Sequence, residues 1–322
     1  MRAAVLEAPS TIRVHEVAVP EPGPGEVRIK LEGCGVCASN VEPFEGQPWS
    51  TFPGEPGGMG HESWGIVDAV GPDVTDVAVG DRVAALSGRS YAQYDVAAAD
   101  MVVKLPDALG GRPFPGEPLG CAFNIFRRSD VRAGQTVAIV GIGFLGAVLC
   151  RLASDAGARV IAISRRESSL ELARAYGAAE TIPMHDHYAI ISRVQELTGG
   201  KGCERVIEAV GKQWPLDLAG ELVAEGGRLV IAGYHQDGAR QVSMQMWNWK
   251  GIDVANAHER DPAVQMRGLR EAVEAVASGR LDPEPLYTHR YPLERLDEAL
   301  TATRDKPDGF VKALVMFDGA DA

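Results

Sequence analysis

Near Arg132 the spacing of the apolar residues changes, and this change limits the possible folds of the 322-residue chain more than any other feature. Up to about Val103, short alternating runs such as VRIKLEG and GIVDAVG are broken by loops rich in glycine and proline. Beyond Arg132, apolar runs such as TVAIVG and RVIAIS alternate with segments of helical spacing. Period-two alternation predicts strands, and repeated β-α-β units predict a doubly wound parallel sheet with helices on both faces. We therefore expect an α/β protein with two domains.

The pattern changes again after about Asn256. A helix is expected over 263–278, extended chain over 286–300 and a final strand over 309–317. A terminal strand needs a sheet edge to join, and chain termini often lie close together, so the β-rich domain is its natural host. The predicted boundaries are 1–125 with 257–322 for the β-rich domain, and 126–256 for the parallel-sheet domain.

Composition excludes several classes of protein. The net charge is −12 and neither sign forms a long block, so nucleic acid and anionic membranes are not expected partners. No apolar stretch is long enough to cross a bilayer, and the start of the chain lacks the apolar core of a signal peptide, which favours a cytoplasmic location. The five cysteines are odd in number and scattered, which suits reduced thiols or metal ligands better than a disulfide framework.

A glycine-rich turn follows the β-branched run that ends at Val140. In Gly141-Ile142-Gly143-Phe144-Leu145-Gly146 the first glycine permits a tight turn, the second lets the backbone approach a pyrophosphate, and the third lets helix and strand pack closely. The GxGxxG pattern alone is weak, but its place between a strand and a helix predicts a dinucleotide site. The alternative is a packing turn without a ligand.

The end of the second strand of this series bears on which dinucleotide is bound. An acidic residue there would bind the ribose 2′-hydroxyl of NAD, yet the sequence has Ser164, Arg165 and Arg166 before the first acid. A guanidinium offers a fixed fork to phosphate oxygens, so these residues favour NADP(H) over NAD(H). The alternative is that both arginines are simply solvated.

The motif Cys34-Gly35-Val36-Cys37 has three interpretations: a redox dithiol, half of a four-cysteine zinc site, or one metal ligand beside a bystander. No second CxxC exists, which excludes the four-thiolate site, and a redox pair is expected near a β-α-β motif. One ligand is the best account. His61 follows 24 residues after Cys37, and with carboxylates at Glu62 and Glu117 the set offers the ligands of an open catalytic zinc site. The alternative is a histidine that is only hydrogen-bonded in a loop.

Several segments together resemble the zinc-dependent alcohol dehydrogenases of the medium-chain dehydrogenase/reductase family, over nearly the whole chain. They are GCGVCASN (33–40), GHE (60–62), VGDRV (79–83), EPLGCAFN (117–124), VGIGFLG (140–146), YGAAETI (176–182) and GFVKALV (309–315). The resemblance implies a GroES-like β-rich catalytic domain built from both chain ends, a Rossmann domain that binds NAD(P)(H), and an active site in the cleft between them.

Residue by residue, the resemblance implies that Cys37 and His61 bind a catalytic zinc ion. Ser39 then matches the hydroxyl that passes the substrate proton, and Glu62 the carboxylate behind or on the zinc. The third protein ligand in polyol-type members is the glutamate of an EPL motif, which here is Glu117. Cys121 is the competing candidate.

The remaining cofactor contacts also follow from the resemblance. Lys312 is similar to a basic residue near the cofactor pyrophosphate. Further contacts are assigned to the ends of the later strands, at Ala209, Val210 and Gly233. Pocket-lining positions are expected at Phe44, Trp49, Ser87, Tyr91, Phe123 and Val254.

The sequence departs from the family pattern in three places. The lobe with four cysteines that binds a structural zinc is missing, so only one catalytic zinc is expected. Asn40 stands where an aspartate is common. The histidine that relays protons to solvent in some members has no counterpart near Glu42 to Glu45.

The implied function is hydride transfer between NADP(H), or NAD(H), and a secondary alcohol, its ketone or a polyol-like substrate, with Ser39 taking the hydroxyl proton. A homodimer or homotetramer is expected. Two alternatives remain: a zinc-free NADPH quinone or enoyl reductase of the same superfamily, and a non-catalytic NADPH-binding protein.

Overall fold

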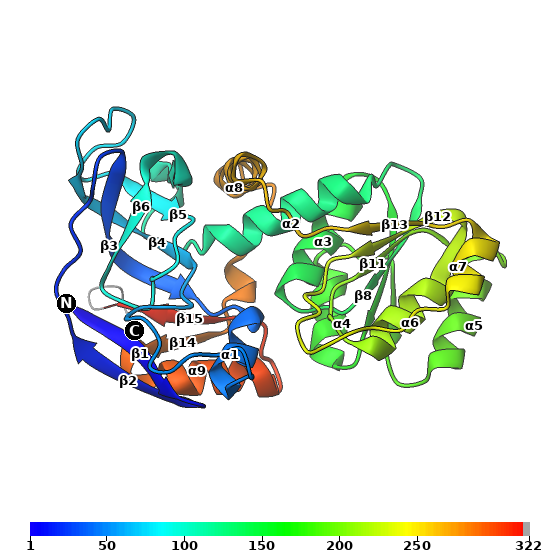
Figure 1. Ribbon diagram of the computed structural model, residues 1–322. Coiled ribbons are helices and arrows are strands. Elements are labelled where there is room, and N and C mark those ends of the chain that lie inside the picture. Colours follow the sequence, from blue (N-terminus) through cyan, green and yellow to red (C-terminus); the bar gives the residue numbers. More distant parts are fainter. Residues whose placement is uncertain (318–322) are drawn as a thin grey trace. The chain divides into compact units, whose positions relative to one another are not determined.

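The computed structural model describes residues 1–317 (Figure 1). The chain divides into two compact units. The β-rich unit comprises Met1–Gly120 and Asp261–Ala322, and the parallel-sheet unit comprises Cys121–Arg260. These divisions fall a few residues from 125/126 and 256/257, where the sequence predicts the domain boundaries.

The β-rich unit is built on a seven-stranded sheet with the order β14-β15-β3-β4-β5-β7, in which β6 also pairs with β3. Its strands are β3 (Glu26–Gly35), β4 (Glu62–Val70), β5 (Arg82–Ala85), β6 (Tyr94–Ala98), β7 (Val102–Lys104), β14 (His289–Pro292) and β15 (Ala313–Met316). A separate hairpin is formed by β1 (Arg2–Ala8) and β2 (Thr11–Glu16). The strand predicted at 309–317 is present as β15, which lies against β3 from the start of the chain (Figure 1).

Alternation along β3 explains why it forms the centre of this sheet. Val27, Ile29 and Leu31 are buried in the hydrophobic core, whereas Lys30 between them is exposed. An irregularity between Leu31 and Gly33 shifts the register, after which Gly35 lies opposite Glu62 of β4. A side chain at Gly35 would overlap the Glu62 carboxylate, so this glycine leaves the space that the carboxylate fills.

Short helices complete the β-rich unit. They are α1 (Val41–Glu45), the first turn of α2 (Gly116–Ser129), α8 (Pro262–Ala277), α9 (Leu296–Asp305) and five 3-10 segments, η1 (Ala38–Asn40), η2 (Ala99–Met101), η3 (Asp107–Leu109), η4 (Glu284–Leu286) and η5 (Leu293–Arg295). The helix predicted over 263–278 is confirmed as α8. The prediction of extended chain over 286–300 is wrong at its end, because α9 begins at Leu296. Its buried residues Leu296, Ala299, Leu300 and Thr303 follow helical spacing.

The parallel-sheet unit contains a six-stranded sheet with the order β10-β9-β8-β11-β12-β13, and every neighbouring pair is parallel. Its strands are β8 (Thr136–Val140), β9 (Arg159–Ser164), β10 (Glu180–Pro183), β11 (Cys203–Glu208), β12 (Val223–Ile231) and β13 (Asp253–Asn256). Its helices, besides the rest of α2, are α3 (Phe144–Asp155), α4 (Glu167–Ala175), α5 (His187–Thr198), α6 (Gln213–Leu222) and α7 (Met244–Lys250). The predicted doubly wound parallel sheet is confirmed.

The strand order of this sheet reverses between β8 and β11. In open α/β sheets, ligands bind outside the carboxyl ends of the strands at such a reversal. Val137 to Val140 of β8 are completely buried, which accounts for the continuous apolar run that the sequence shows there. Within residues 1–317, none of the helices is long and apolar enough to cross a membrane.

Candidate functional site

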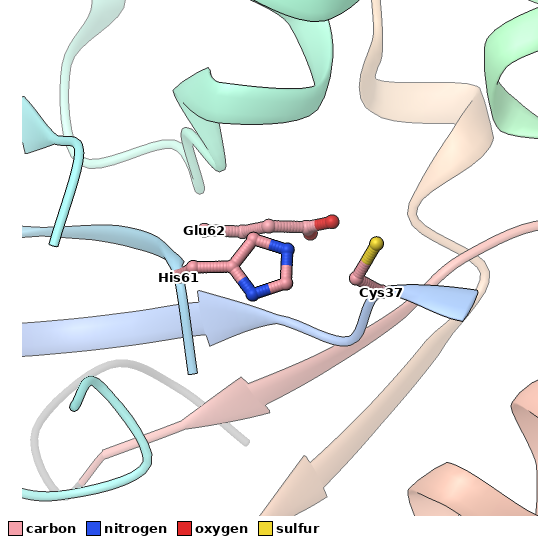
Figure 2. A group of neighbouring side chains, drawn as sticks. All are labelled: Cys37, His61 and Glu62. Carbon is pink, nitrogen blue, oxygen red and sulfur yellow. The ribbon is translucent and has the colours of Figure 1, made fainter. Parts of the chain in front are cut away.

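Cys37, His61 and Glu62 come together in the β-rich unit, where β3 ends and β4 begins (Figure 2). Cys37 follows β3 and precedes η1, His61 directly precedes β4, and Glu62 is its first residue. The sulfur, one imidazole nitrogen and one carboxylate oxygen all lie within 4.8 Å of one another. Thiolate, imidazole and carboxylate are the ligand types that zinc takes in catalytic sites.

A hydrogen-bonded network fixes the His61 ring. Its Nδ1 lies 2.7 Å from the carbonyl oxygen of Met59, so Nδ1 carries a proton, and Nε2 is the nitrogen that faces Cys37 and could bind a metal. The same carbonyl accepts from the Asn40 amide at 3.1 Å, and Asn40 in turn accepts from the Tyr91 hydroxyl at 2.8 Å. Met59 has a positive φ of 72°, a conformation that few residues other than glycine adopt. An aspartate at position 40 could not donate to this carbonyl, which gives the departure at Asn40 a structural reason.

Negative charge gathers around the His61 imidazole. Burial by itself lowers the pKa of His61, but the hydrogen bond and charge of Cys37, with smaller contributions from Glu117 and Glu62, raise it to about 10. A bound dication would balance the same negative charge, so the electrostatics of the site fit zinc.

Glu62 and Lys312 form a buried ion pair. The Lys312 ammonium donates to Glu62 Oε1 at 2.6 Å and to the Val36 carbonyl at 3.3 Å. Glu62 Oε2 lies 2.5 Å from the same ammonium, so both carboxylate oxygens face Lys312. Burial lowers the pKa of Lys312, but the charge of Glu62, together with Cys37 and Glu117, raises it above its ordinary value. The structure thus places Lys312, predicted beside the pyrophosphate, on the carboxylate of the candidate metal centre.

The other predicted residues of this centre take different positions. Ser39 donates its hydroxyl to the Cys37 sulfur at 3.2 Å. Glu117, in the first turn of α2, is outside the group of three but close enough for its charge to act on His61 and Lys312. Cys121 belongs to the parallel-sheet unit.

Burial, with the charge of Glu62, raises the pKa of the Cys34 thiol well above its ordinary value, which argues against a reactive dithiol of Cys34 and Cys37.

The glycine turn of the parallel-sheet unit follows β8 and opens α3. Gly141 has a φ of 101°, and a side chain there would overlap Val210. A side chain at Gly146 would overlap the carbonyl oxygen of Gly141, so this glycine lets the helix approach the strand. A side chain at Gly143 would meet nothing within 4 Å, and Gly143 has an extended backbone. The fold itself therefore does not require a glycine at 143, and the open space there suits a ligand at the first turn of α3, where Phe144 and Leu145 begin the helix.

Glu208, at the end of β11, is the central polar group of this site and was not identified from the sequence. Its side chain is completely buried. Oε1 accepts from the backbone N–H groups of Val210 and Gly211 at 2.7 and 2.8 Å, and Oε2 accepts from His235 at 3.0 Å. A side chain at Gly233 would lie 2.7 Å from Glu208 Oε2. The predicted contacts Val210 and Gly233 thus lie against this carboxylate, and Ala209 directly follows it in the sequence. The sequence signal of Glu208 is a charge that ends the buried run VIE at 206–208.

The network around Glu208 extends to the surface. Arg240 Nε donates to His235 Nδ1 at 2.8 Å, which leaves the His235 proton on Nε2, facing Glu208. Arg240 also contacts Asp237, which accepts from Lys212 at 2.7 Å.

At the carboxyl end of β9, Ser164 is buried and Arg165 is exposed. Arg165 forms no ion pair within residues 1–317, whereas Arg166 is half-buried at the N-cap of α4. Of the predicted pocket residues, Phe44 and Tyr91 belong to the core of the β-rich unit. Trp49 and Val254 are exposed, Ser87 is half-buried and Phe123 lies on α2.

Comparison with known proteins finds relatives among the dehydrogenases. The family model described as alcohol dehydrogenase GroES-like domain matches residues 23–107, and the one described as zinc-binding dehydrogenase matches residues 145–275. An alcohol dehydrogenase of Geobacillus stearothermophilus is 33% identical over 268 residues, covering 72% of this chain and 77% of the relative. A quinone oxidoreductase of Pseudomonas aeruginosa is 31% identical over 255 residues, covering 77% of each. The mycobacterial protein Rv1454c, solved in complex with NADPH, superposes with a TM-score of 0.86 at 25% identity over 98% of this chain and 99% of that one.

A glycine turn on a parallel sheet and a cysteine, histidine and glutamate cluster on a GroES-like unit define an oxidoreductase of the NAD(P)-dependent class. The chain belongs to the zinc-binding medium-chain dehydrogenases/reductases.

Proposed function

We propose that the chain is a zinc-dependent alcohol dehydrogenase that transfers a hydride between NADP(H), or less favourably NAD(H), and a secondary alcohol, its ketone or a polyol-like substrate. The observation that carries this proposal is the cluster of Cys37, His61 and Glu62. His61 presents Nε2 toward Cys37. A thiol, an imidazole and a carboxylate gathered within 4.8 Å are the ligand types of a catalytic zinc site, which favours the zinc-dependent class over a zinc-free reductase.

Zinc at this cluster would supply Lewis-acid polarisation of the substrate oxygen, and the dinucleotide would exchange the hydride. The chain's own residues hold the ligands and move the proton. The Met59 carbonyl fixes the His61 tautomer, and Lys312 compensates the charge of Glu62. Ser39 would relay the substrate proton: its hydroxyl, which donates to the Cys37 sulfur in this structure, would accept the proton of the substrate hydroxyl and release its own proton to water.

The zinc-free quinone reductase is the rival, and a curated relative carries that activity in its name. Metal analysis of the purified protein, with turnover measured before and after chelation, separates the two. We expect zinc in the protein and loss of turnover on chelation that zinc restores. Retained reductase activity without zinc would refute the proposal. A panel of polyols, secondary alcohols and aldehydes with both cofactors then defines the substrate, and zinc and cofactor bound without any turnover would favour the non-catalytic alternative.

We propose Glu117 as the protein ligand that completes the zinc site. Its charge already acts on His61, although it lies outside the group of three. Glu117→Ala should lower the zinc content of the purified protein, and Cys121→Ser is the matched control. Unchanged zinc in the first variant with lowered zinc in the second would reassign the ligand to Cys121.

We propose NADP(H) as the preferred cofactor, on the position of Arg165 and Arg166 directly after β9. Replacing both by alanine should raise the KM for NADPH much more than that for NADH. Arg151→Ala on α3, whose arginine pairs with Asp155, removes a positive charge elsewhere on the same unit and should change neither. Equal effects on the two cofactors would refute the assignment.

The expected homodimer or homotetramer remains a proposal, as does the cytoplasmic location. Support for assembly comes from the edge of the parallel sheet, where Val254 of β13 is 41% exposed and Trp249 of α7 is 86% exposed. Exposed apolar residues beside a strand edge are typical of an interface. Light scattering of the purified protein tests the assembly, and a monomer at all concentrations would exclude it.

A further inference from the structure

A chain of hydroxyl groups in the β-rich unit leads to a buried carboxylate and is not used in the proposed mechanism. Ser63 and Ser90 are completely buried and Asp95 is 5% exposed, whereas Ser87 is only half-buried. The Ser63 and Ser87 oxygens are 3.1 Å apart, those of Ser87 and Ser90 are 2.7 Å apart, and Ser90 donates to Asp95 Oδ2 at 2.7 Å. Ser87 is therefore the member of this hydroxyl chain that a ligand can reach.

The number of protons available gives the series of hydrogen-bonded hydroxyls a direction. Asp95 accepts from the backbone N–H of Arg89 at 3.0 Å and from its neighbour Val96 at 2.8 Å, in addition to Ser90. A carboxylate only accepts, so the proton of Ser90 is committed to Asp95. Ser90 must then accept from Ser87.

The same reasoning fixes the other end of the chain. Because the single proton of Ser87 goes to Ser90, Ser87 must accept from Ser63. Every hydroxyl proton of the chain thus points toward the carboxylate. Ser87 Oγ keeps one lone pair and no proton for a further partner.

The backbone connects this hydroxyl chain to the candidate metal centre. Ser63 follows Glu62 directly in β4. The backbone N–H of Ser90 donates to the carbonyl of Gly60 at 3.0 Å, and a side chain at Gly60 would overlap the backbone of Ser90 and Tyr91. The loop that carries Ser87 thus packs against the residue before His61.

We propose that Ser87 is a specificity-determining residue. Its hydroxyl, held by Ser63 and Ser90 and polarised by Asp95, serves only as a hydrogen-bond acceptor toward the substrate. It selects substrates with a second hydroxyl beside the reacting carbon over substrates with an ether or carbonyl oxygen there. This inference rests on the proposed alcohol dehydrogenase function.

Three secondary alcohols of similar size test the proposal with the zinc-loaded enzyme and NADP⁺. They are 1,2-propanediol, its ether 1-methoxy-2-propanol, and 2-butanol, which has no second oxygen. The diol should exceed the ether in kcat/KM by about tenfold or more, because an acceptor facing an ether oxygen leaves both without a donor. A diol-to-ether ratio near one in the wild type would overturn the proposal.

Substitutions in the hydroxyl chain should change the diol-to-ether ratio in a pattern that a role in packing alone would not produce. Ser87→Ala should bring the ratio close to one with 2-butanol turnover largely retained, and Ser87→Thr should restore the preference. Ser90→Ala frees the proton of Ser87 to donate outward, so the preference for the diol should shrink although the Ser87 hydroxyl remains.

Ser129→Ala is the control, since Ser129 is a serine in the other unit that is completely buried, like Ser63 and Ser90, and donates to the Ile125 carbonyl. It should leave the ratio unchanged. A ratio that survives Ser87→Ala, or that falls equally in Ser129→Ala, contradicts the inference while the alcohol dehydrogenase function stands. No turnover of any alcohol, polyol or aldehyde in the wider panel, with either cofactor, overturns the proposed function and this inference with it.

Discussion

The two units build their candidate sites from different materials. In the β-rich unit, charged side chains are held by other side chains, as in the buried pair of Glu62 and Lys312. In the parallel-sheet unit, the candidate site is formed mainly by backbone. Gly141 and Gly146 contribute because they have no side chain. The first site should therefore be sensitive to the charge of its residues, and the second to their volume. Substitutions at three places in the structure can break or sharpen this contrast.

The largest effect is expected at the buried ion pair. Lys312→Met in the metal-free protein leaves the Glu62 carboxylate without its counter-charge, and should lower the free energy of unfolding by about 3–5 kcal/mol. Urea unfolding followed by fluorescence measures the change. The double variant with Glu62→Gln removes both charges and should recover most of the loss. A single-variant loss below about 1 kcal/mol would show that the β-rich site is not governed by charge.

A pair of glycines tests the volume side of the contrast. Gly146→Ala forces a methyl group against the Gly141 carbonyl, and should cost about 1–3 kcal/mol, seen as a lower Tm. Gly143→Ala meets no atom within 4 Å and should leave the Tm unchanged. It should nevertheless weaken NADPH binding about tenfold or more, if the dinucleotide fills the open space. Equal Tm values for the two variants, or unchanged NADPH affinity in Gly143→Ala, would contradict the interpretation.

The smallest effect is expected at the surface end of the Glu208 network. Hydrogen bonds from Lys212 and Arg240 lower the pKa of Asp237 from 3.8 to about 2. A lowered pKa means that the stabilisation is present above the ordinary value and is lost as the pH falls toward 2. Asp237→Asn should thus cost at most about 1 kcal/mol at pH 7, after solvent screening, and this cost should shrink as the pH falls through 2. A cost that did not change with pH would show that Asp237 acts by packing instead.

Much of the fold could be predicted from local patterns. Alternation identified the β-rich region, and the apolar runs identified the parallel sheet, because burial on one or two faces leaves its period in the sequence. The helix from Leu296 to Asp305 was missed because its apolar residues directly follow a strand and include Ala299 and Thr303, which are weak apolar signals.

The candidate sites were only partly predictable. Cys37, His61 and Glu62 could be grouped because each lies in a short motif. The contact between Glu62 and Lys312 joins residues 250 positions apart, and no local pattern contains it. Glu208 could have been found as a charge that ends a buried strand, but its partners at Val210 and Gly211 are backbone groups, which any residue offers.

The separation between Glu62 and Lys312 also sets an order of assembly during synthesis. Residues 121–260 are contiguous, so the parallel-sheet unit is complete on the ribosome before Lys312 has been made. Cys37, His61 and Glu62 emerge earlier still, but until β15 joins β3 the Glu62 carboxylate lacks its counter-charge. The parallel-sheet unit can therefore fold cotranslationally. The candidate metal centre gains its buried ion pair only once nearly the whole described chain has been translated.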